Sequence, residues 1–211
     1  MKTYNQTDKK PKLLLATFNP GKIREYRSLL RGYYELVTPA EIGLDIALSE
    51  PAVSYEENAR SKAATGARAS QLITLADDSG LEVEALGGKP GSFSARFAGE
   101  NAADKDRVNY LLSQLEDIPW EKRRARFVCV IAIATPEGKV ELCQGECSGF
   151  ITNEPRGSNG FGYDPVFYFP DLGKTMAELT LDKKNQVSHR GKAAKQALKA
   201  LAGILHVGAF L

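Results

Sequence analysis

The chain has 211 residues, enough for one sizeable core or for one domain divided into two lobes around a cleft. Its 28 lysine and arginine residues nearly balance 26 aspartate and glutamate residues, and a net charge of +2 excludes a general attraction to nucleic acid or to an anionic membrane. No apolar run approaches the roughly 18 residues of a membrane helix, and three cysteines in an ordinary composition argue against a disulfide framework. We therefore expect no nucleic-acid or membrane partner, and any anion site is expected to be local.

The N-terminal segment is polar, and the apolar patch after it, residues 13–16, is shorter than the roughly 7 to 15 residues of a signal-peptide core. We expect residues 1–12 to be a disordered tail and the protein to be cytoplasmic. Strand-like runs alternate with helical patterns through the first half of the chain, which favours an α/β architecture. No linker divides the chain, so residues 13–211 are expected to form a single domain.

The first predicted strand, residues 13–17, leads directly into a predicted helix. Asn19 is a favourable N-cap and Pro20 suits the first helical position. Free backbone N–H groups at such a helix start attract anions, and Lys22 adds a cation beside them. We interpret Thr17, Asn19 and Lys22 as lining an anion site, with an ordinary capped helix as the alternative.

The same stretch does not form a P-loop. No glycine stands five residues before Gly21, and Ile23 follows the lysine where a serine or threonine would bind magnesium. The pattern thus excludes a Walker-type nucleotide triphosphatase.

A second helix is predicted from Ser54, which begins a capping-box pattern. An apolar strand at residues 73–76 comes next, and Asp77 and Asp78 follow its end directly. Ligands gather at the carboxyl ends of strands in open α/β sheets, so we expect the Asn19 turn and the aspartate pair to open on one crevice.

Side chains alternate in direction along a strand, so only one of the two aspartates is expected to face a given site. Aspartates in a surface turn are the alternative. Upstream carboxylates at Glu50, Glu56 and Glu57 would complete a magnesium sphere, because Mg²⁺ takes one or two carboxylates together with waters and phosphate oxygens. Each of these glutamates would equally suit a helix start.

The middle of the chain offers weaker signals. Residues 104–115 have apolar side chains at helical spacing and are interpreted as scaffold. Two strand-like runs joined by a Thr-Pro-Glu-Gly turn at residues 135–138 predict a hairpin. The glycine-rich stretch at residues 87–99 is long for a plain connection and indicates a functional loop, with a simple loop as the alternative.

A later stretch, residues 158–169, sets aromatic residues among glycines. Phe161, Tyr163 and Asp164 lie there, and the glycines let an aromatic ring stand free of its backbone for stacking. A hairpin or bulge with core aromatics is the alternative interpretation.

The last predicted helix follows Ser188, which suits the N-cap. His189 and Arg190 then occupy its first turn, against the preference of the helix dipole. A bound anion or an acceptor-rich ligand would explain this placement. Together with Lys184, these donors would otherwise form a solvated charged turn.

Taken together, the stretches resemble the inosine triphosphate pyrophosphatase family, also called dITP/XTP pyrophosphatases, which hydrolyse non-standard purine nucleoside triphosphates. The matching pieces, in the family's order, are ATFNPGK, ENA, ADDSGLEVEALGGKPGSFSARFAG, GFGYDPVF, KTMAEL and SHRGKA, and they span about residues 13–200. The resemblance implies a monophosphate and a diphosphate as products, magnesium dependence and a homodimer. It also implies a two-lobed α/β fold around a long mixed sheet flanked by helices, with the cleft between the lobes.

The resemblance implies roles for individual residues. Asp78 would be the catalytic carboxylate and a metal contact, with Glu50 or Asp77 as a further metal ligand and Glu57 as the alternative to Glu50. The implied substrate-binding residues are Thr17, Phe18, Asn19, Pro20, Gly21, Lys22, Ser79, Phe161, Gly162, Tyr163, Asp164, Lys184, His189 and Arg190.

Within this set, the residues of the Asn19 turn would hold the triphosphate, and Phe161 would stack on the base. Lys184, His189 and Arg190 would complete base recognition. Phe18 stands where a small or polar residue is expected from the resemblance, which would narrow the phosphate cradle.

Substrate choice follows from counting donors and acceptors. Inosine and xanthosine carry an acceptor carbonyl at the purine 6-position, where adenosine has an amino donor. Donors aimed at that position would be left unpaired against adenine, at a cost of about 1 to 3 kcal/mol per group. ITP, dITP and XTP are therefore expected to be hydrolysed far better than ATP.

Overall fold

A computed structural model of the protein describes residues 10–48 and 54–208, with side chains described as far as residue 205. Glu50 and most of the expected N-terminal tail lie outside the described residues. The expected tail boundary at residue 12 is one residue late, because Lys12 already begins the first strand.

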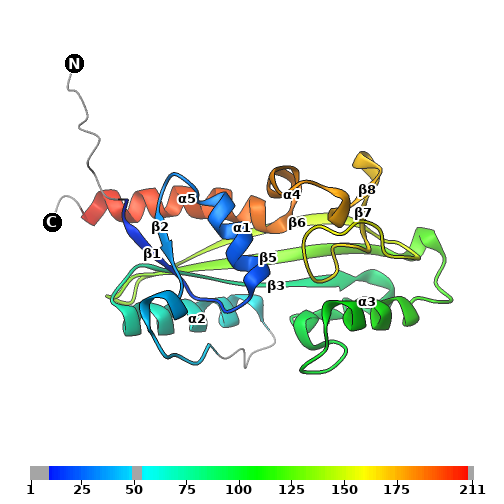
Figure 1. Ribbon diagram of the computed structural model, residues 1–211, viewed down its shortest axis with the longest axis horizontal. Helices are drawn as coiled ribbons and strands as arrows, with labels where there is room; N and C mark the ends of the chain where they lie inside the picture. The colour runs from blue at the N-terminus through cyan, green and yellow to red at the C-terminus, as the bar shows by residue number, and fades with distance from the viewer. Residues whose placement is uncertain (1–9, 49–53, 209–211) are drawn as a thin grey trace, which may run out of the picture.

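An eight-stranded mixed sheet forms the centre of the molecule (Figure 1). Its strands are β1 (Lys12–Leu15), β2 (Glu35–Val37), β3 (Thr74–Val83), β4 (Pro90–Gly91), β5 (Arg124–Ala134), β6 (Val140–Ile151), β7 (Phe167–Phe169) and β8 (Lys174–Thr175). The strand order is β2-β1-β3-β5-β6-β7-β8, and β4 pairs with β3. Because β1 pairs in parallel with β2 and β3 while the other pairs are antiparallel, the expected long mixed sheet is confirmed.

Helices cover both faces of this sheet. The α-helices are α1 (Pro20–Leu29), α2 (Tyr55–Ser70), α3 (Asp104–Ser113), α4 (Leu181–Val187) and α5 (His189–Gly208). Short 3₁₀ turns lie at Ala40–Ile42, Glu84–Leu86, Ser94–Arg96, Trp120–Lys122, Pro170–Leu172 and Met176–Glu178. In Figure 1, α1, α4 and α5 lie on one side of β3 and β5, and α2 lies on the other.

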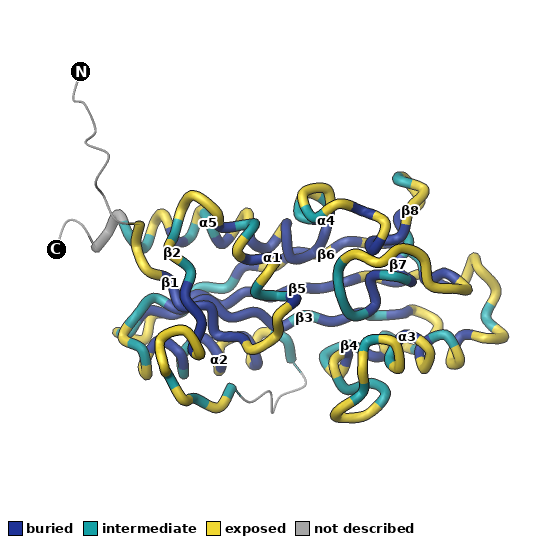
Figure 2. The backbone as a smooth tube through the Cα atoms, in the orientation of Figure 1, coloured by how far each residue is buried: buried dark blue, intermediate teal, exposed yellow. Residues whose placement is uncertain are grey.

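Three apolar clusters hold these layers together. One joins α1 and α5 to the sheet, a second joins the alanines of α2 to the opposite face, and a third surrounds α3 and the far ends of β3, β5 and β6. Figure 2 shows β3 and β5 as buried over most of their length. Cys129, Cys143 and Cys147 are buried and form no disulfide.

The local signals of the helix starts are confirmed. The Asn19 side chain accepts the Lys22 N–H at 3.1 Å, and the Ser54 hydroxyl accepts the Glu57 N–H at 3.3 Å. The Ser188 hydroxyl accepts the N–H of residue 191 at 3.1 Å. The predicted hairpin is also present as β5 and β6. No helix in the described part of the chain is both long and apolar enough to span a membrane.

Strand β3 differs from the expectation. The sequence predicted a strand that ends at residue 76, whereas β3 continues through both aspartates to Val83. The reason is its neighbour β5, which pairs with β3 without interruption from Thr74 opposite Ala134 to Val83 opposite Ala125. The aspartate pair therefore lies in the middle of a strand and not at its end.

The edge of β3 that faces away from β5 is only partly paired, and a site can form where it is open. Strand β1 pairs there only with Thr74 and Leu75, and β4 pairs only with Leu81 and Glu82. Among the described residues, no strand pairs with residues 76–80 on this edge. This unpaired interval holds both aspartates.

Candidate active site

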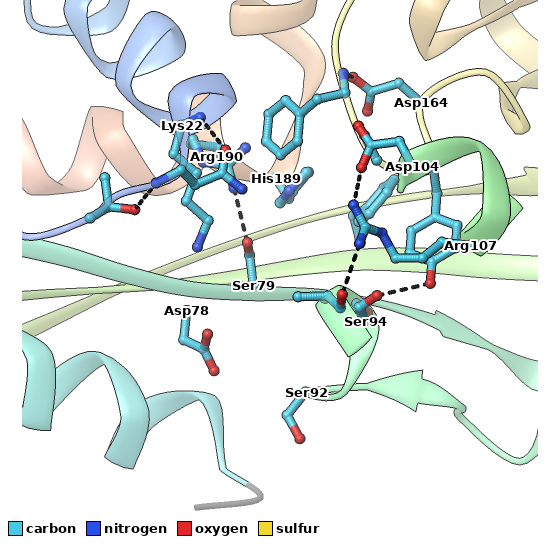
Figure 3. A pocket seen from close by; sticks show the side chains of 18 of the residues that line it. Lys22, Asp78, Ser79, Ser92, Ser94, Asp104, Arg107, Asp164, His189 and Arg190 are labelled. Atoms are coloured by element: carbon cyan, nitrogen blue, oxygen red, sulfur yellow. Dashed lines mark hydrogen bonds and ion pairs between the residues drawn. The ribbon is translucent and has the colours of Figure 1, made fainter. Parts of the chain in front are cut away.

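A cavity of about 350 Å³ opens at this free interval of β3 (Figure 3). It is lined by segments far apart in the sequence: the turn between β1 and α1, the middle of β3, the loop before α3, α3 itself, the aromatic loop at residues 158–164, and the start of α5. The expected crevice is therefore present and joins the Asn19 turn to Asp78, although it opens at the middle of β3 and not at a strand end.

The turn between β1 and α1 supplies the candidate anion site. Thr17, Phe18, Asn19 and Lys22 all line the cavity. The Thr17 hydroxyl accepts the Asn19 N–H at 3.2 Å, which fixes the turn. Pro20 has no N–H and the Lys22 N–H is accepted by Asn19, so the positive end of the helix dipole and the Lys22 ammonium are the features that favour a bound anion here.

Gly21, in the first turn of α1, lets the Phe161 ring approach the helix backbone closely. A Cβ atom at this position would lie 2.5 Å from Cδ1 of Phe161, closer than real Cβ contacts allow. The absence of a side chain therefore lets the Phe161 ring pack directly on the first turn of α1.

The two aspartates point to opposite faces of the sheet, as the alternation along a strand predicted. Asp78 lines the cavity and is 3% exposed. Its Oδ2 accepts the Asn58 side-chain N–H at 3.0 Å, and its Oδ1 lies 3.3 Å from Nζ of Lys62. Both partners belong to α2, and Figure 3 shows Asp78 on the side of β3 opposite Lys22 and Arg190.

Asp77 is buried on the other face and is not among the residues that line the cavity. Its Oδ1 lies 2.9 Å from Nζ of Lys22, and its Oδ2 lies 3.1 Å from the Arg190 guanidinium. Burial opposes ionisation of this carboxyl, but the charges of Lys22 and Arg190 outweigh burial and hold its pKa below the usual value. Asp77 is thus an ionised partner for two cavity-lining cations.

Glu25 has the same relation to a second pair of cations. Its carboxylate lies 2.6 Å from Nζ of Lys184 and 2.8 Å from Nη1 of Arg190, and it is 1% exposed. Burial by itself would raise the pKa of Glu25, but the positive charges of Arg190 and Lys184 lower it by more. The pKa of Glu25 is therefore below its usual value. Lys184 also pairs with Asp164, whose own pKa is raised by burial against the influence of that lysine.

The start of α5 is explained by these contacts. Arg190 is neutralised by Asp77 and Glu25, and its Nη2 donates to the Ser79 hydroxyl at 2.9 Å. His189 is buried, and this burial, together with the positive charges of Arg190 and Lys184, lowers its pKa well below the usual value. The first turn of α5 therefore carries a neutral imidazole and a paired guanidinium, and a bound anion is not required to explain it.

The neighbours of His189 hold the ring in place. The imidazole stacks on Phe127 at 4.6 Å between ring centroids with 10° between the planes, and its Nδ1 lies 3.9 Å from the Cys147 sulfur. The alternative of a solvated turn is wrong for Lys184, His189 and Arg190, since all three are buried and line the cavity.

The aromatic loop forms the opposite wall. The Phe161 ring centroid lies 5.0 Å from Nζ of Lys184 and 5.4 Å from the guanidinium carbon of Arg190. The Asp164 carboxylate accepts the Phe161 N–H at 2.9 Å, which fixes the loop internally. A flat ring beside two cations is a suitable surface for an electron-rich base.

A divalent cation fits this cavity through Asp78. No group of three or more His, Cys, Asp or Glu side chains within residues 10–48 and 54–205 is placed to hold a metal ion on its own. Mg²⁺ commonly takes one or two carboxylates and completes its sphere with water and substrate phosphates, so a single cavity-facing carboxylate suits it. Asp77 is turned away from the cavity and occupied by Lys22 and Arg190.

Most of the predicted site residues come together. Those that line the cavity are Thr17, Phe18, Asn19, Lys22, Asp78, Ser79, Phe161, Gly162, Tyr163, Asp164, Lys184, His189 and Arg190. Pro20, Gly21 and Asp77 are not among the lining residues.

Four charged residues of the site were not recognised in the sequence. Lys62 lies one turn after Asn58 in α2, and Glu25 lies one turn after Lys22 in α1. Both are charged residues on a helix face that packs against the sheet, and this placement is the signal that was missed. Asp104 and Arg107 line the cavity, so the interpretation of residues 104–115 as scaffold alone is wrong.

Comparison with known proteins agrees with this geometry. The Ham1 family model matches residues 13–200. The chain is 45% identical over 190 residues to the dITP/XTP pyrophosphatase of Bacillus subtilis, covering 89% of this chain and 96% of that protein. It is 48% identical over 190 residues to the dITP/XTP pyrophosphatase of Thermus thermophilus, covering 90% of this chain and 91% of that protein.

Solved structures give the same result. The Ham1 protein of Staphylococcus aureus matches with a TM-score of 0.80 and 41% identity, covering 91% of this chain and 98% of that one. The HAM1 protein of Coxiella burnetii matches with a TM-score of 0.81 and 40% identity, covering 92% and 99%. With a family match over nearly the whole described chain, the protein belongs to the Ham1 family.

Proposed function

We propose that the protein hydrolyses non-standard purine nucleoside triphosphates, namely ITP, dITP and XTP, to the monophosphate and diphosphate with Mg²⁺, and so clears them from the nucleotide pool. The observation that carries the proposal is the single cavity in which a cation-flanked helix start, the Asp78 carboxylate and the Phe161 ring come together. The printed activity of the relatives, dITP/XTP pyrophosphatase, supports the same reaction.

The Asn19 turn is the proposed phosphate end of the cavity. The positive N-terminal end of α1 and the Lys22 ammonium would bind the triphosphate and offset the negative charge that develops as diphosphate leaves. Because Asp77 holds Lys22 from behind at 2.9 Å, the ammonium is already positioned before substrate arrives.

Asp78 is the proposed catalytic carboxylate. Phosphoryl transfer depends mainly on positioning and charge neutralisation, so a carboxylate held by Asn58 and Lys62 would orient the attacking water or accept its proton. Mg²⁺ held by Asp78 would supply charge neutralisation at the phosphate oxygens. Glu50, outside the described residues, remains the proposed second metal ligand, and the contacts of Asp77 favour a supporting role for that residue instead.

The base would bind between the aromatic loop and α5. Phe161 would stack on the purine, and Lys184, His189 and Arg190 would donate hydrogen bonds to its carbonyl oxygen. The lowered pKa of His189 leaves a neutral ring, which donates through one nitrogen only. Adenine presents an amino donor at the corresponding position, which would leave these donors unpaired.

We also infer that residues 13–211 act as one two-lobed domain, because one sheet carries both lobes. Homodimerisation and a cytoplasmic location are proposed on the family resemblance.

Diphosphate release from a nucleotide panel tests the proposal. Turnover of ITP, dITP and XTP should exceed that of ATP by at least about tenfold in kcat/KM, be lost in a chelator, and return with Mg²⁺. Equal kcat/KM for ATP would overturn the substrate assignment. Tight ITP binding without any diphosphate release would instead indicate a nucleotide sensor.

A further inference from the structure

Helix α3 reaches across the cavity to the aromatic loop. Its first residue, Asp104, accepts the N–H of Gly162 through Oδ2 at 2.7 Å, although the two residues are 58 positions apart in the chain. Gly162 lies directly between Phe161 and Tyr163 and has a φ of +61°, a conformation that side chains disfavour. The carboxylate therefore contacts the backbone at the point where the loop presents its aromatic ring.

Asp104 is itself held by its own lobe. Its Oδ1 pairs with Nη2 of Arg107, and the same guanidinium donates to the carbonyl oxygens of Ala95, at 3.0 Å, and of Ala102. Figure 3 shows the Arg107 guanidinium beside Asp104 and close to Ser94. Arg107 thus fixes the carboxylate in the direction of Gly162.

A second contact crosses the cavity beside the first. The Tyr163 hydroxyl donates to the carbonyl oxygen of Ser94 at 2.9 Å. Two consecutive residues of the aromatic loop are therefore fastened, Gly162 to the first residue of α3 and Tyr163 to the segment between β4 and α3. A loop that is ordered before the ligand arrives saves the entropy cost of ordering it on binding.

We propose that Asp104 is a positioning residue for the purine base: by accepting the Gly162 N–H it fixes the Phe161 ring in the orientation on which the base stacks, and Arg107 holds Asp104 in place. This inference rests on the proposed function of the cavity. An acidic residue in the first turn of a helix also interacts favourably with the helix dipole, but that role involves no contact with residue 162.

The chain offers a matched control in the same turn. Asp106 accepts the Ala103 N–H at 3.1 Å and caps α3 without any described contact to the aromatic loop. Both substitutions remove an acidic side chain from the first turn of α3. Only the Asp104 substitution removes a hydrogen bond to the aromatic loop. The two variants therefore separate helix stabilisation from loop positioning.

The test compares Asp104→Ala, Asp104→Asn and Asp106→Ala. Steady-state kinetics with ITP give KM and kcat, and calorimetry gives the Kd of IMP and of inorganic diphosphate.

Loss of a hydrogen bond to a charged acceptor predicts a rise of about tenfold in the KM for ITP and in the Kd of IMP for Asp104→Ala. The Kd of diphosphate and kcat should stay within about twofold, because the phosphate end and Asp78 lie on other elements. Asp104→Asn keeps a side-chain oxygen acceptor and should restore the KM to within about threefold of wild type.

Specific results would overturn the inference: an unchanged Kd of IMP in Asp104→Ala, an equal rise in Asp106→Ala, or an equal weakening of diphosphate binding. The proposed function fails separately, through absence of diphosphate release from ITP by the unmodified protein. The Kd of IMP needs no turnover and so tests Asp104 in either case.

Discussion

Asp77 and Asp78 are adjacent on β3, yet their carboxylates serve opposite faces of the sheet: Asp77 pairs with Lys22 and Arg190, and Asp78 contacts Asn58 and Lys62. Only Asp78 lines the cavity. The pair therefore divides into one residue that faces the cavity and one that fixes the cations around it.

Asp78→Asn should abolish most turnover. Removing the cavity-facing carboxylate removes the proposed metal contact and the group that orients water, at a cost of about 10²- to 10⁴-fold in kcat. The change weakens the ion pair with the buried Lys62 and so costs some stability, but the fold should persist because the amide keeps the shape and one acceptor for the α2 partners. Diphosphate release and a thermal melt measure the two effects. A near wild-type melt with retained activity would show that Asp78 is not the catalytic carboxylate.

Asp77→Asn should act mainly through stability. The change leaves the charges of Lys22 and Arg190 without one of their buried partners, and breaking such a pair costs about 3 to 5 kcal/mol of unfolding free energy. Urea unfolding of both asparagine variants gives the comparison. If Asp78→Asn were the more destabilised of the two, the division of roles would be wrong.

Glu25→Gln tests the second internal carboxylate. Glu25 is buried between Lys184 and Arg190, so loss of its charge should lower the free energy of unfolding by about 3 to 5 kcal/mol. Glu41→Gln is the matched control, because Glu41 pairs with Arg27 at an exposed position, where an ion pair contributes at most about 1 kcal/mol. Equal losses in the two variants would argue against a specific role for the buried network.

Gly21→Ala should displace the Phe161 ring. The new Cβ would lie 2.5 Å from that ring, so the ring must move, and base binding should weaken with a rise of about tenfold in the KM for ITP. Gly203→Ala, in α5, has no neighbour within 4 Å of the new Cβ and should leave the KM unchanged while stabilising the helix by about 0.5 to 1 kcal/mol. An unchanged KM in Gly21→Ala would mean that the ring adapts without cost.

Stability should fall as the pH falls below about 6.5, because His189 is then protonated in the unfolded chain but stays neutral in the folded one. The unfolded state binds more protons in this range, so the free energy of unfolding decreases by up to about 1.4 kcal/mol per pH unit. The raised pKa of Asp164 acts in the opposite sense, so the histidine is isolated by comparison with His189→Gln.

Urea unfolding between about pH 5 and 8 measures this dependence. The glutamine variant should give a flatter curve than wild type. An identical slope in the two proteins would show that the buried imidazole is not the source.

The local features of the fold were predictable because their causes are local. Asn19 and Ser54 cap their helices through N–H groups three residues away, and the turn at 135–138 needs only its own proline and glycine. The clustering of site residues was predictable through the family resemblance, which places the motifs in order without giving their contacts.

By itself, the amino-acid sequence determined the helix starts, the α/β class, the alternation of Asp77 and Asp78 and the candidate site segments. Only the tertiary structure decided that β3 continues through the aspartates, because an antiparallel partner strand supplies the ladder and pairs Asp77 with Ile131 and Asp78 with Val130. It likewise decided that Arg190 is paired internally, and that Asp104 belongs to the site. The contacts of Arg190 and Asp104 depend on ion pairs and hydrogen bonds between residues 58 to 165 positions apart, and no local pattern encodes them.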